Sequence, residues 1–233
     1  MKISVVTICW NAERVVRSTL ESTLTQNYEN FEVVIIDGQS SDKTLEIIYS
    51  IIDKFHFPQE RITIISEKDK GVYDAMNKGV RIAKGEYVLF MNCGDSFYNN
   101  NVLSNFDKAL ERGENADVYY GNTIMNFYEG KGVFHDGEDT PRNSVMPFIH
   151  QSAITRRSLL VKHPFDLSYR ICADFELYYW MRASKCRFIH ENFIVSCYDA
   201  REGLSENNPL QIRREKDRIT GIDKSPNYFV KKI

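Results

Sequence analysis

The sequence lacks the cysteine pattern of a disulfide-bonded or zinc-binding protein. Its five cysteines, Cys9, Cys93, Cys172, Cys186 and Cys197, are odd in number and widely scattered, and no two form a Cys-x-x-Cys pair. This distribution fits neither a disulfide framework nor a zinc site. A reducing compartment is therefore expected, and the cytosol is the natural one.

Long hydrophobic runs are also missing. No stretch approaches the roughly 18 apolar residues of a membrane-spanning helix. The first apolar residues give way to Asn11 and Glu13 too early for the core of a signal peptide. We therefore expect a cytoplasmic protein. The formal net charge of −2 provides no basic surface for nucleic acid, so no nucleic-acid partner is expected.

What the sequence does contain is the composition of an ordinary globular protein. Hydrophobic residues make up 42% and charged residues 27% of its 233 positions. This length suits one well-cored domain and is too short for two full-sized ones. A single domain over residues 1–233 is expected.

Four strand-then-helix units are predicted in the first half. Each begins with a near-continuous apolar run of strand length and continues with apolar residues at helical spacing. The predicted strands are 3–8, 31–36, 62–65 and 87–91, and the predicted helices are 12–24, 45–55, 73–83 and 102–110. Strands of this kind are buried on both faces. The pattern predicts the α/β class, with a Rossmann-like, doubly wound and mostly parallel sheet.

The alternation changes after residue 117. The expected elements are strands at 118–125, 133–135, 187–189 and 193–198, and helices at 173–183 and 210–220. A long loop at 136–147 carries two prolines, and in a compact domain such a loop is more often a binding lid than filler. The second half, 117–233, is therefore predicted to be mixed α+β and to end in a C-terminal helix.

Polar side chains follow each of the four predicted parallel strands. Ligands of open parallel sheets bind at the carboxyl ends of the strands. The residues at these ends are Thr7, Asn11 and Glu13, then Asp37, then Lys70, and finally Asn92, Gly94 and Asp95. Any one of these acids or small residues alone could simply cap the following helix. Together they predict one ligand site along a single edge of the sheet.

Asp37 ends an otherwise apolar strand. A carboxylate there gains little from packing, but it can accept a hydrogen bond from an imide N–H such as that of uracil. The alternative interpretation is an acid that forms the turn before Gly38.

Asn92 and Asp95 supply hard oxygen atoms around Gly94, which lets the backbone approach a ligand closely. This chemistry suits Mn²⁺ or Mg²⁺ on a diphosphate, with Asp95 as the metal ligand. Such cations take further ligands from phosphate and water, so one carboxylate and a partner suffice. A turn without a ligand is the alternative.

These motifs resemble a known family. Residues 3–7 with Asn11, and the segment 33–44, are similar to the opening of family 2 glycosyltransferases of the GT-A fold. Segments 71–79, 83–87 and 91–95 look like the next motifs of that family, and the resemblance is thinner beyond them. It is strongest to a bacterial group with an Asn-x-Gly-Asp metal motif that adds sugars to exopolysaccharide, O-antigen or capsule repeat units.

The resemblance implies a donor half, 1–116, and an acceptor half, 117–233. It assigns base contact to Asp37 and the metal to Asp95. The usual motif has a carboxylate where this sequence has Asn92, whose amide carries no charge, so a weaker metal requirement is expected. The other residues assigned to the nucleotide-sugar donor are Thr7, Asn11, Glu13, Lys70, Asn77, Asn92 and Gly94.

Inverting enzymes of this family deprotonate the acceptor hydroxyl with a carboxylate near the start of a later helix. The best match here is the segment 173–176, so Asp174 is the predicted base and Glu176, on a different helix face, is the fallback. A base of ordinary pKa suffices, because the hydroxyl becomes strongly acidic only as it attacks. Alternatively, both acids merely complement the helix dipole.

Further residues are assigned to the acceptor or the diphosphate. His150, Gln151 and Arg157 form a polar cluster that corresponds to the acceptor side in the family, although a lone histidine is often structural. Segment 203–205 is either a lid over the donor or a loop without function. The basic segment 212–219 either touches anionic lipid beside a lipid-linked acceptor or is a solvated helix face.

The expected function is transfer of one sugar, with inversion, from a nucleotide-diphosphate sugar to an acceptor hydroxyl. A UDP-sugar is favoured, and the acceptor is expected to be a saccharide or a lipid-linked saccharide in cell-surface polysaccharide biosynthesis. The Gln-x-x-Arg-Trp signature of processive synthases is absent. Two alternatives stay open: a catalytically inactive nucleotide-sugar binding module and a sugar nucleotidyltransferase.

Overall fold

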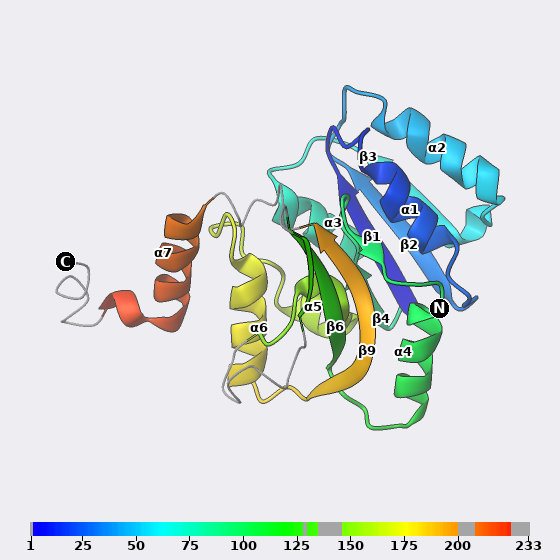
Figure 1. The fold of residues 1–233 in the computed structure, drawn as a ribbon. Coiled ribbons are helices and arrows are strands. Elements are labelled where there is room, and N and C mark those ends of the chain that lie inside the picture. Colours follow the sequence, from blue (N-terminus) through cyan, green and yellow to red (C-terminus); the bar gives the residue numbers. More distant parts are fainter. Residues whose placement is uncertain (1, 128–129, 135–145, 200–207, 225–233) are drawn as a thin grey trace.

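One sheet of nine strands organises the described part of the protein in the computed structural model (Figure 1). The structure describes residues 2–127, 130–134, 146–199 and 208–224. The strand order is β3-β2-β1-β4-β8-β6-β9-β5, and β7 pairs with β6 outside this row. The loop predicted at 136–147 lies almost wholly outside the described residues, and so does the 203–205 segment.

The first four strands confirm the predicted parallel arrangement. They are β1 (Ile3–Cys9), β2 (Phe31–Asp37), β3 (Ile62–Ser66) and β4 (Tyr87–Phe90). Cys9 pairs in register with Asp37, and Asp37 pairs with Ser66. The carboxyl ends of these strands therefore lie side by side, which brings the predicted polar residues to one edge.

The second half extends the same sheet. Its strands are β5 (Ser96–Phe97), β6 (Val118–Phe127), β7 (Gly130–Phe134), β8 (Ala153–Arg156) and β9 (Phe188–Asp199). β8 runs antiparallel between β4 and β6, while β9 runs parallel to β6. The prediction of two strands at 187–189 and 193–198 is wrong, because they form the single strand β9. Register shifts opposite Asn122 accommodate the polar residues in its middle.

Seven α-helices lie among the described residues. They are α1 (Val16–Leu24), α2 (Thr44–Phe55), α3 (Val72–Ile82), α4 (Val102–Glu111), α5 (Arg157–Lys162), α6 (Ala173–Ala183) and α7 (Pro209–Thr220). α1 begins at Val16 instead of Ala12, and residues 13–15 form a turn in which Val15 N donates to the Ala12 carbonyl at 3.0 Å. No described helix has the length and apolar character needed to cross a membrane.

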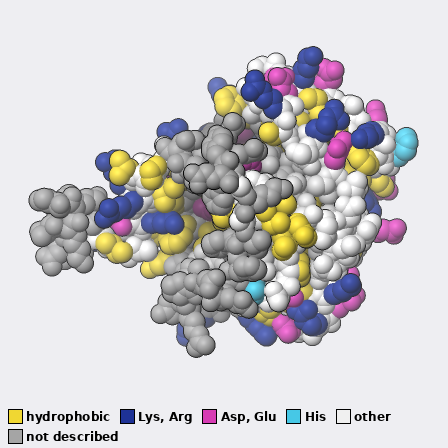
Figure 2. All heavy atoms as spheres, in the orientation of Figure 1, with side chains coloured by type: hydrophobic (Ala, Val, Ile, Leu, Met, Phe, Trp, Pro, Cys, Tyr) yellow, Lys and Arg dark blue, Asp and Glu magenta, His cyan; other side chains and the backbone are white. Residues whose placement is uncertain are grey.

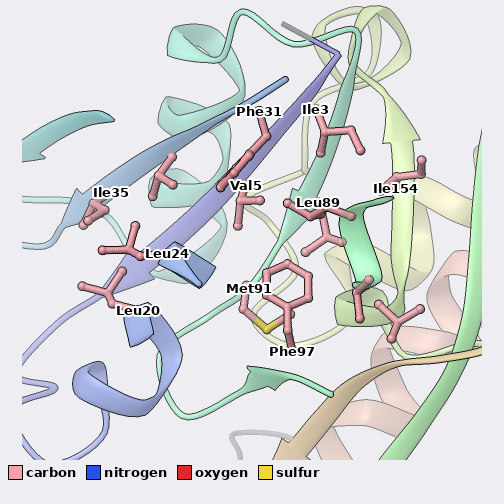
Figure 3. Close-up of a cluster of buried hydrophobic side chains, with 14 of the residues drawn as sticks. Ile3, Val5, Leu20, Leu24, Phe31, Ile35, Leu89, Met91, Phe97 and Ile154 are labelled. Carbon is pink, nitrogen blue, oxygen red and sulfur yellow. The ribbon is translucent and has the colours of Figure 1, made fainter. Parts of the chain in front are cut away.

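Helices cover both faces of the sheet. On one face, Val5 and Leu89 pack against Leu20 and Leu24 of α1 and against Phe97 (Figure 3). The opposite face of the same strands packs against α3 and α6 in a second buried cluster. Alternate residues of each strand feed the two clusters, as a doubly wound sheet requires. This part of the fold prediction is confirmed.

α3 packs unusually close to β1. A Cβ atom built on Gly79 would lie 2.4 Å from Cγ1 of Val6. Only glycine permits this approach without displacing the helix. The close packing holds the first turn of α3 beside the carboxyl end of β1.

Candidate active site

Asp37 is fully buried at the end of β2. Its carboxylate accepts hydrogen bonds from Ser40 N at 3.0 Å, Ser40 Oγ at 2.5 Å and Ser66 Oγ at 2.6 Å. Since a carboxylate has about four acceptor positions, Asp37 has little capacity left for a ligand. The acid is at the predicted edge, but it chiefly shapes the loop that follows β2.

The predicted donor residues Asn11 and Glu13 join the loops after β1 and β2. Asn11 has a positive φ of 47°, and its Oδ1 accepts Ser41 N at 2.9 Å. Glu13 Oε2 accepts Lys43 N at 3.2 Å. Thr7 is buried, and its Oγ1 has no hydrogen-bond partner among the described residues.

The turn from Asn92 to Asp95 is held by helix α1. Thr19 Oγ1 donates to the carbonyl of Asp95 at 2.6 Å and accepts Gly94 N at 3.1 Å. Gly94 has a φ of 106°, which disfavours any residue with a side chain. The predicted metal turn is thus a fixed element, anchored from outside its own strand.

Asp95 is 6% exposed inside this turn. Gln151 Nε2 donates to Asp95 Oδ2 at 2.6 Å, and Asp199 N donates to Oδ1 at 3.3 Å. Burial raises the pKa of Asp95 to about 6, although the Gln151 hydrogen bond and the charge of His150 oppose the rise. Gln151, which is also buried, therefore lies in direct contact with the predicted metal ligand.

His150 connects the metal turn to the predicted base. Its Nε2 lies 3.0 Å from Asn92 Nδ2, and its Nδ1 lies 3.5 Å from Asp174 Oδ2. Since the amide of Asn92 can donate here and the carboxylate can only accept, these partners favour a proton on Nδ1 when the ring is neutral. Three residues far apart in the sequence thus form one continuous polar chain.

Asp174 is the second residue of α6, and its side chain is 19% exposed. Its Oδ1 accepts Phe175 N at 2.8 Å and the hydroxyl of Tyr73 at 3.2 Å. Burial alone raises the pKa of Asp174, but the hydrogen bond and charge of His150, with the bonds from Phe175 and Tyr73, outweigh it. The net pKa is lower than usual. An ionised and partly accessible carboxylate can accept a proton from a hydroxyl within hydrogen-bond reach.

Two buried amide oxygens beside this chain lack partners among the described residues. They are Asn92 Oδ1 and Gln151 Oε1. Leaving such an acceptor unsatisfied costs about 1–3 kcal/mol. No group of three or more His, Cys, Asp or Glu side chains suited to a metal occurs in the described ranges. Amide oxygens with Asp95 nevertheless fit a hard cation such as Mn²⁺ or Mg²⁺ that also binds phosphate.

A pocket of about 590 Å³ opens beside this cluster. It is formed by the end of β1 with Trp10, the loop 69–71, the start of α3 and the segment 167–170. Lys70 and Arg170 contribute two cations to its lining and Asp69 and Asp74 two carboxylates, and Tyr73 connects it to Asp174. A pocket of this size accommodates a small organic ligand, since such sites are about 300–1,000 Å³.

Three predicted site residues are engaged elsewhere. The amide of Asn77 exchanges two 2.9 Å hydrogen bonds with the backbone of Phe165. Glu176 contacts His163 at 3.1 Å, and Arg157 donates to the carbonyl oxygen of Val80 at 3.0 Å. The structure therefore does not bring these side chains into the cluster around Asp95 and Asp174.

Several lining residues were not predicted from the sequence. Tyr73 and Arg170 contact the pocket, and Trp10 is 69% exposed at its edge. A tryptophan two residues after the first predicted strand was a usable signal. The position of Arg170 had none, because the segment before α6 reaches β1 only through the tertiary fold.

Solved structures of the GT-A type share this fold. S. aureus TarS (1–349) matches 94% of this chain and 64% of its own at 21% identity, with a TM-score of 0.72. The mannosyltransferase PcManGT from Pyrobaculum calidifontis, solved with GDP-Man and Mn²⁺, matches 91% of this chain and 60% of its own at 18% identity, with a TM-score of 0.66. The chain thus spans less than two thirds of either protein.

Sequence comparison gives the family. Residues 4–171 match glycosyl transferase family 2. A PGL/p-HBAD biosynthesis glycosyltransferase of Mycobacterium tuberculosis is 33% identical over 202 residues, which cover 84% of this chain and 75% of that protein. Glycosyltransferase GlyG of Streptococcus pneumoniae is 31% identical over 57% of this chain and 42% of its own. The chain belongs to glycosyl transferase family 2, and the predicted GT-A fold is confirmed.

Proposed function

We propose that the protein moves one sugar from a nucleotide-diphosphate sugar to an acceptor hydroxyl, with inversion at the anomeric carbon. The observation that carries this proposal is the chain from Asn92 through His150 to Asp174, with distances of 3.0 Å and 3.5 Å. It links a turn suited to a diphosphate-bound metal with a carboxylate suited to proton abstraction. A transferase needs these two functions at adjacent positions.

The donor nucleoside occupies the pocket beside β1 and α3 in this proposal. Lys70 and Arg170 offer positive charge to its phosphates, and Asp95 with the amide oxygens of Asn92 and Gln151 holds Mn²⁺ or Mg²⁺. The cation, when bound, neutralises charge on the departing diphosphate. TarS has been solved with UDP-GlcNAc, which favours a UDP-sugar, and PcManGT with GDP-Man and Mn²⁺.

Asp174 acts as the base. Its Oδ2 takes the proton of the acceptor hydroxyl, while Tyr73 and His150 hold the carboxylate in place. Its lowered pKa keeps it ionised near neutral pH. Because the attacking oxygen approaches opposite the leaving diphosphate, the product has the inverted configuration.

The acceptor is proposed to be a saccharide, lipid-linked at the cytoplasmic face of a membrane, in cell-surface glycan biosynthesis. The similar M. tuberculosis protein is named for PGL/p-HBAD biosynthesis. Residues 1–116 supply the donor half and 117–233 the acceptor half, although Gln151 and Arg170 of the second half also reach the donor site in this proposal. The exposed Arg213 and Arg214 of α7 offer positive charge to anionic lipid.

The test begins with nucleoside diphosphates. Thermal shifts are measured with UDP, GDP and dTDP, each with and without Mn²⁺, and a rise in Tm is expected with at least one of them. If none stabilises the fold, the donor site is assigned wrongly.

Release of nucleoside diphosphate is then measured from sugar donors with and without EDTA. Turnover separates the enzyme from an inactive nucleotide-sugar binding module, which the neutral Asn92 would otherwise favour. Binding without turnover across UDP-, GDP- and dTDP-sugars and lipid-linked acceptors would support the binding module.

A further inference from the structure

Helix α7 lies beyond α6 at the outer end of the described molecule (Figure 1). This end displays hydrophobic and basic side chains on the visible face (Figure 2). Glu215 is the one buried residue of the helix and is 4% exposed. Glutamate is almost never buried unless it is paired. The only buried side chain of α7 is therefore a carboxylate, and its burial requires specific hydrogen-bond partners.

The carboxylate of Glu215 binds three consecutive backbone amides. It accepts Arg170 N at 2.9 Å, Ile171 N at 3.0 Å and Cys172 N at 2.8 Å. Gln211 Nε2 adds a fourth hydrogen bond at 2.7 Å. Burial raises the pKa of Glu215, but these four donors outweigh it and the net pKa is below its usual value. Glu215 is thus a charged acceptor with its hydrogen-bonding capacity filled.

The three amides immediately precede α6. Cys172 is the N-cap residue of α6 and contributes no side-chain cap hydrogen bond. The first backbone N–H groups of a helix need acceptors from outside the helix. Glu215 supplies a charged acceptor for the amides at this helix entry, from a residue 43 positions further along the chain than Cys172. The start of α6 is therefore fixed by α7.

The same segment also touches the proposed active site. The hydroxyl of Tyr73 shares its single proton between the carbonyl of Ile171, which is the nearer acceptor, and Asp174 Oδ1. The pocket is lined by Tyr169 and Arg170. One side of this short segment is bound by α7, and the other side contacts the hydroxyl that holds the base.

We propose that Glu215 is a positioning residue for Asp174. By fixing residues 170–172, it sets the height of the first turn of α6 and so aligns the Asp174 carboxylate with Tyr73 and His150. The inference rests on the proposed role of Asp174 as the base. α7 is then part of the catalytic apparatus although none of its residues lines the pocket.

The test compares Glu215→Gln with Glu46→Gln, a matched change at an exposed site on α2. Because misplacement of a catalytic group by about 1 Å costs up to ~100-fold in rate, we expect Glu215→Gln to lower kcat at least about tenfold. Because Arg170 also lines the pocket and donates its backbone N–H to Glu215, kcat is measured at saturating donor, where a change in the KM for the donor does not contribute. Glu46→Gln should match the wild type.

A double-mutant cycle with Asp174→Asn separates positioning from general damage. If Glu215 acts through Asp174, adding Glu215→Gln to Asp174→Asn leaves the residual rate unchanged within about twofold. An equal proportional loss in both backgrounds would overturn the inference, as would an unchanged kcat in the single variant.

A milder variant guards against loss of the fold. Gln211→Ala removes one donor to Glu215 but leaves the three amide bonds. It should lower kcat about threefold in the wild-type background and leave the rate of Asp174→Asn unchanged within about 1.3-fold. Absence of nucleoside-diphosphate binding by the wild type would instead refute the proposed function. Normal binding and a normal Asp174→Asn loss, with multiplicative Glu215 and Gln211 effects, would refute this inference alone.

Discussion

The loops after β1 and β2 and the cluster around His150 use polar residues in opposite ways. In the loops, Asp37, Asn11 and Glu13 bind backbone and side chains of the loops themselves. In the cluster, residues of the segment before β8 meet residues of α6 and of the turn after β4. The side-chain oxygens Asn92 Oδ1 and Gln151 Oε1 have no hydrogen-bond partner among the described residues. The satisfied polar groups of the loops stabilise the fold around the site. The unsatisfied ones in the cluster can bind a ligand, and this binding removes the free-energy cost of leaving them buried without a partner.

The substitution with the largest expected effect is Asp174→Asn, which tests the catalytic role of the cluster. Removing the base should reduce sugar transfer by about 10³-fold, because general bases contribute 10²–10⁴-fold. Initial rates of nucleoside-diphosphate release measure the effect. Glu176→Gln on the same helix serves as the control, since Glu176 contacts His163 instead. Near-wild-type sugar transfer by a folded Asp174→Asn protein would show that Asp174 is not the base and that the cluster does not take part in catalysis.

Asn77→Ala tests whether Asn77, predicted to bind the nucleotide-sugar donor, instead stabilises the fold. It leaves the buried N–H and C=O groups of Phe165 without partners, so the free energy of unfolding should fall by about 2–3 kcal/mol. Urea denaturation measures this change, and calorimetric titration measures nucleotide affinity. A tenfold higher Kd for the nucleotide with unchanged stability would instead show that Asn77 contacts the nucleotide-sugar donor.

The raised pKa of Asp95 predicts two opposite pH dependences. In chelator-treated protein, the contribution of Asp95 to stability is full below its unfolded pKa of about 3.9 and is lost as pH rises through about 6. Mn²⁺ needs the ionised carboxylate, so its affinity should be about tenfold higher at pH 7 than at pH 5. Spin resonance of free Mn²⁺ and thermal melts measure the two trends. Persistence of both in Asp95→Asn would assign them to another group.

The smallest expected effect is that of Ser66→Ala. Asp37 loses one of its hydrogen bonds but keeps both from Ser40, so the free energy of unfolding should fall by about 1 kcal/mol. Transfer rates should remain within about twofold of wild type. A much larger loss of nucleotide affinity than of stability would show that Asp37 contacts the donor directly.

The sequence was sufficient for the parallel half of the sheet. Runs such as 31–36 are apolar at every position, which is typical of strands covered on both faces. The sequence predicts two strands where the structure has β9, because polar residues in the middle of β9 interrupt the apolar pattern. The pairing with β6 continues through this middle part with a bulge. The short helix α5 carries too few apolar positions for a periodic pattern to emerge.

The site was predicted more unevenly. Residues at strand ends could be placed because parallel strands finish at a common edge. The contacts of His150 with Asn92 and Asp174, and of Glu215 with the start of α6, join residues 24 to 58 positions apart and have no local pattern. Asn77 was assigned to the donor by resemblance, while its amide is used to hold the loop at Phe165. Its role in donor binding remains a prediction.

Gly79 gives the pocket a mechanical limit. The helix that forms one wall rests on the side chain of Val6, and Gly79 adds no side chain of its own to this contact, so α3 cannot move closer to the sheet. A methyl group at this position would act as a spacer beneath α3 and push its first turn, with Tyr73, away from β1. The width of the pocket beside β1 and α3 is therefore limited by Gly79, a residue that does not line it.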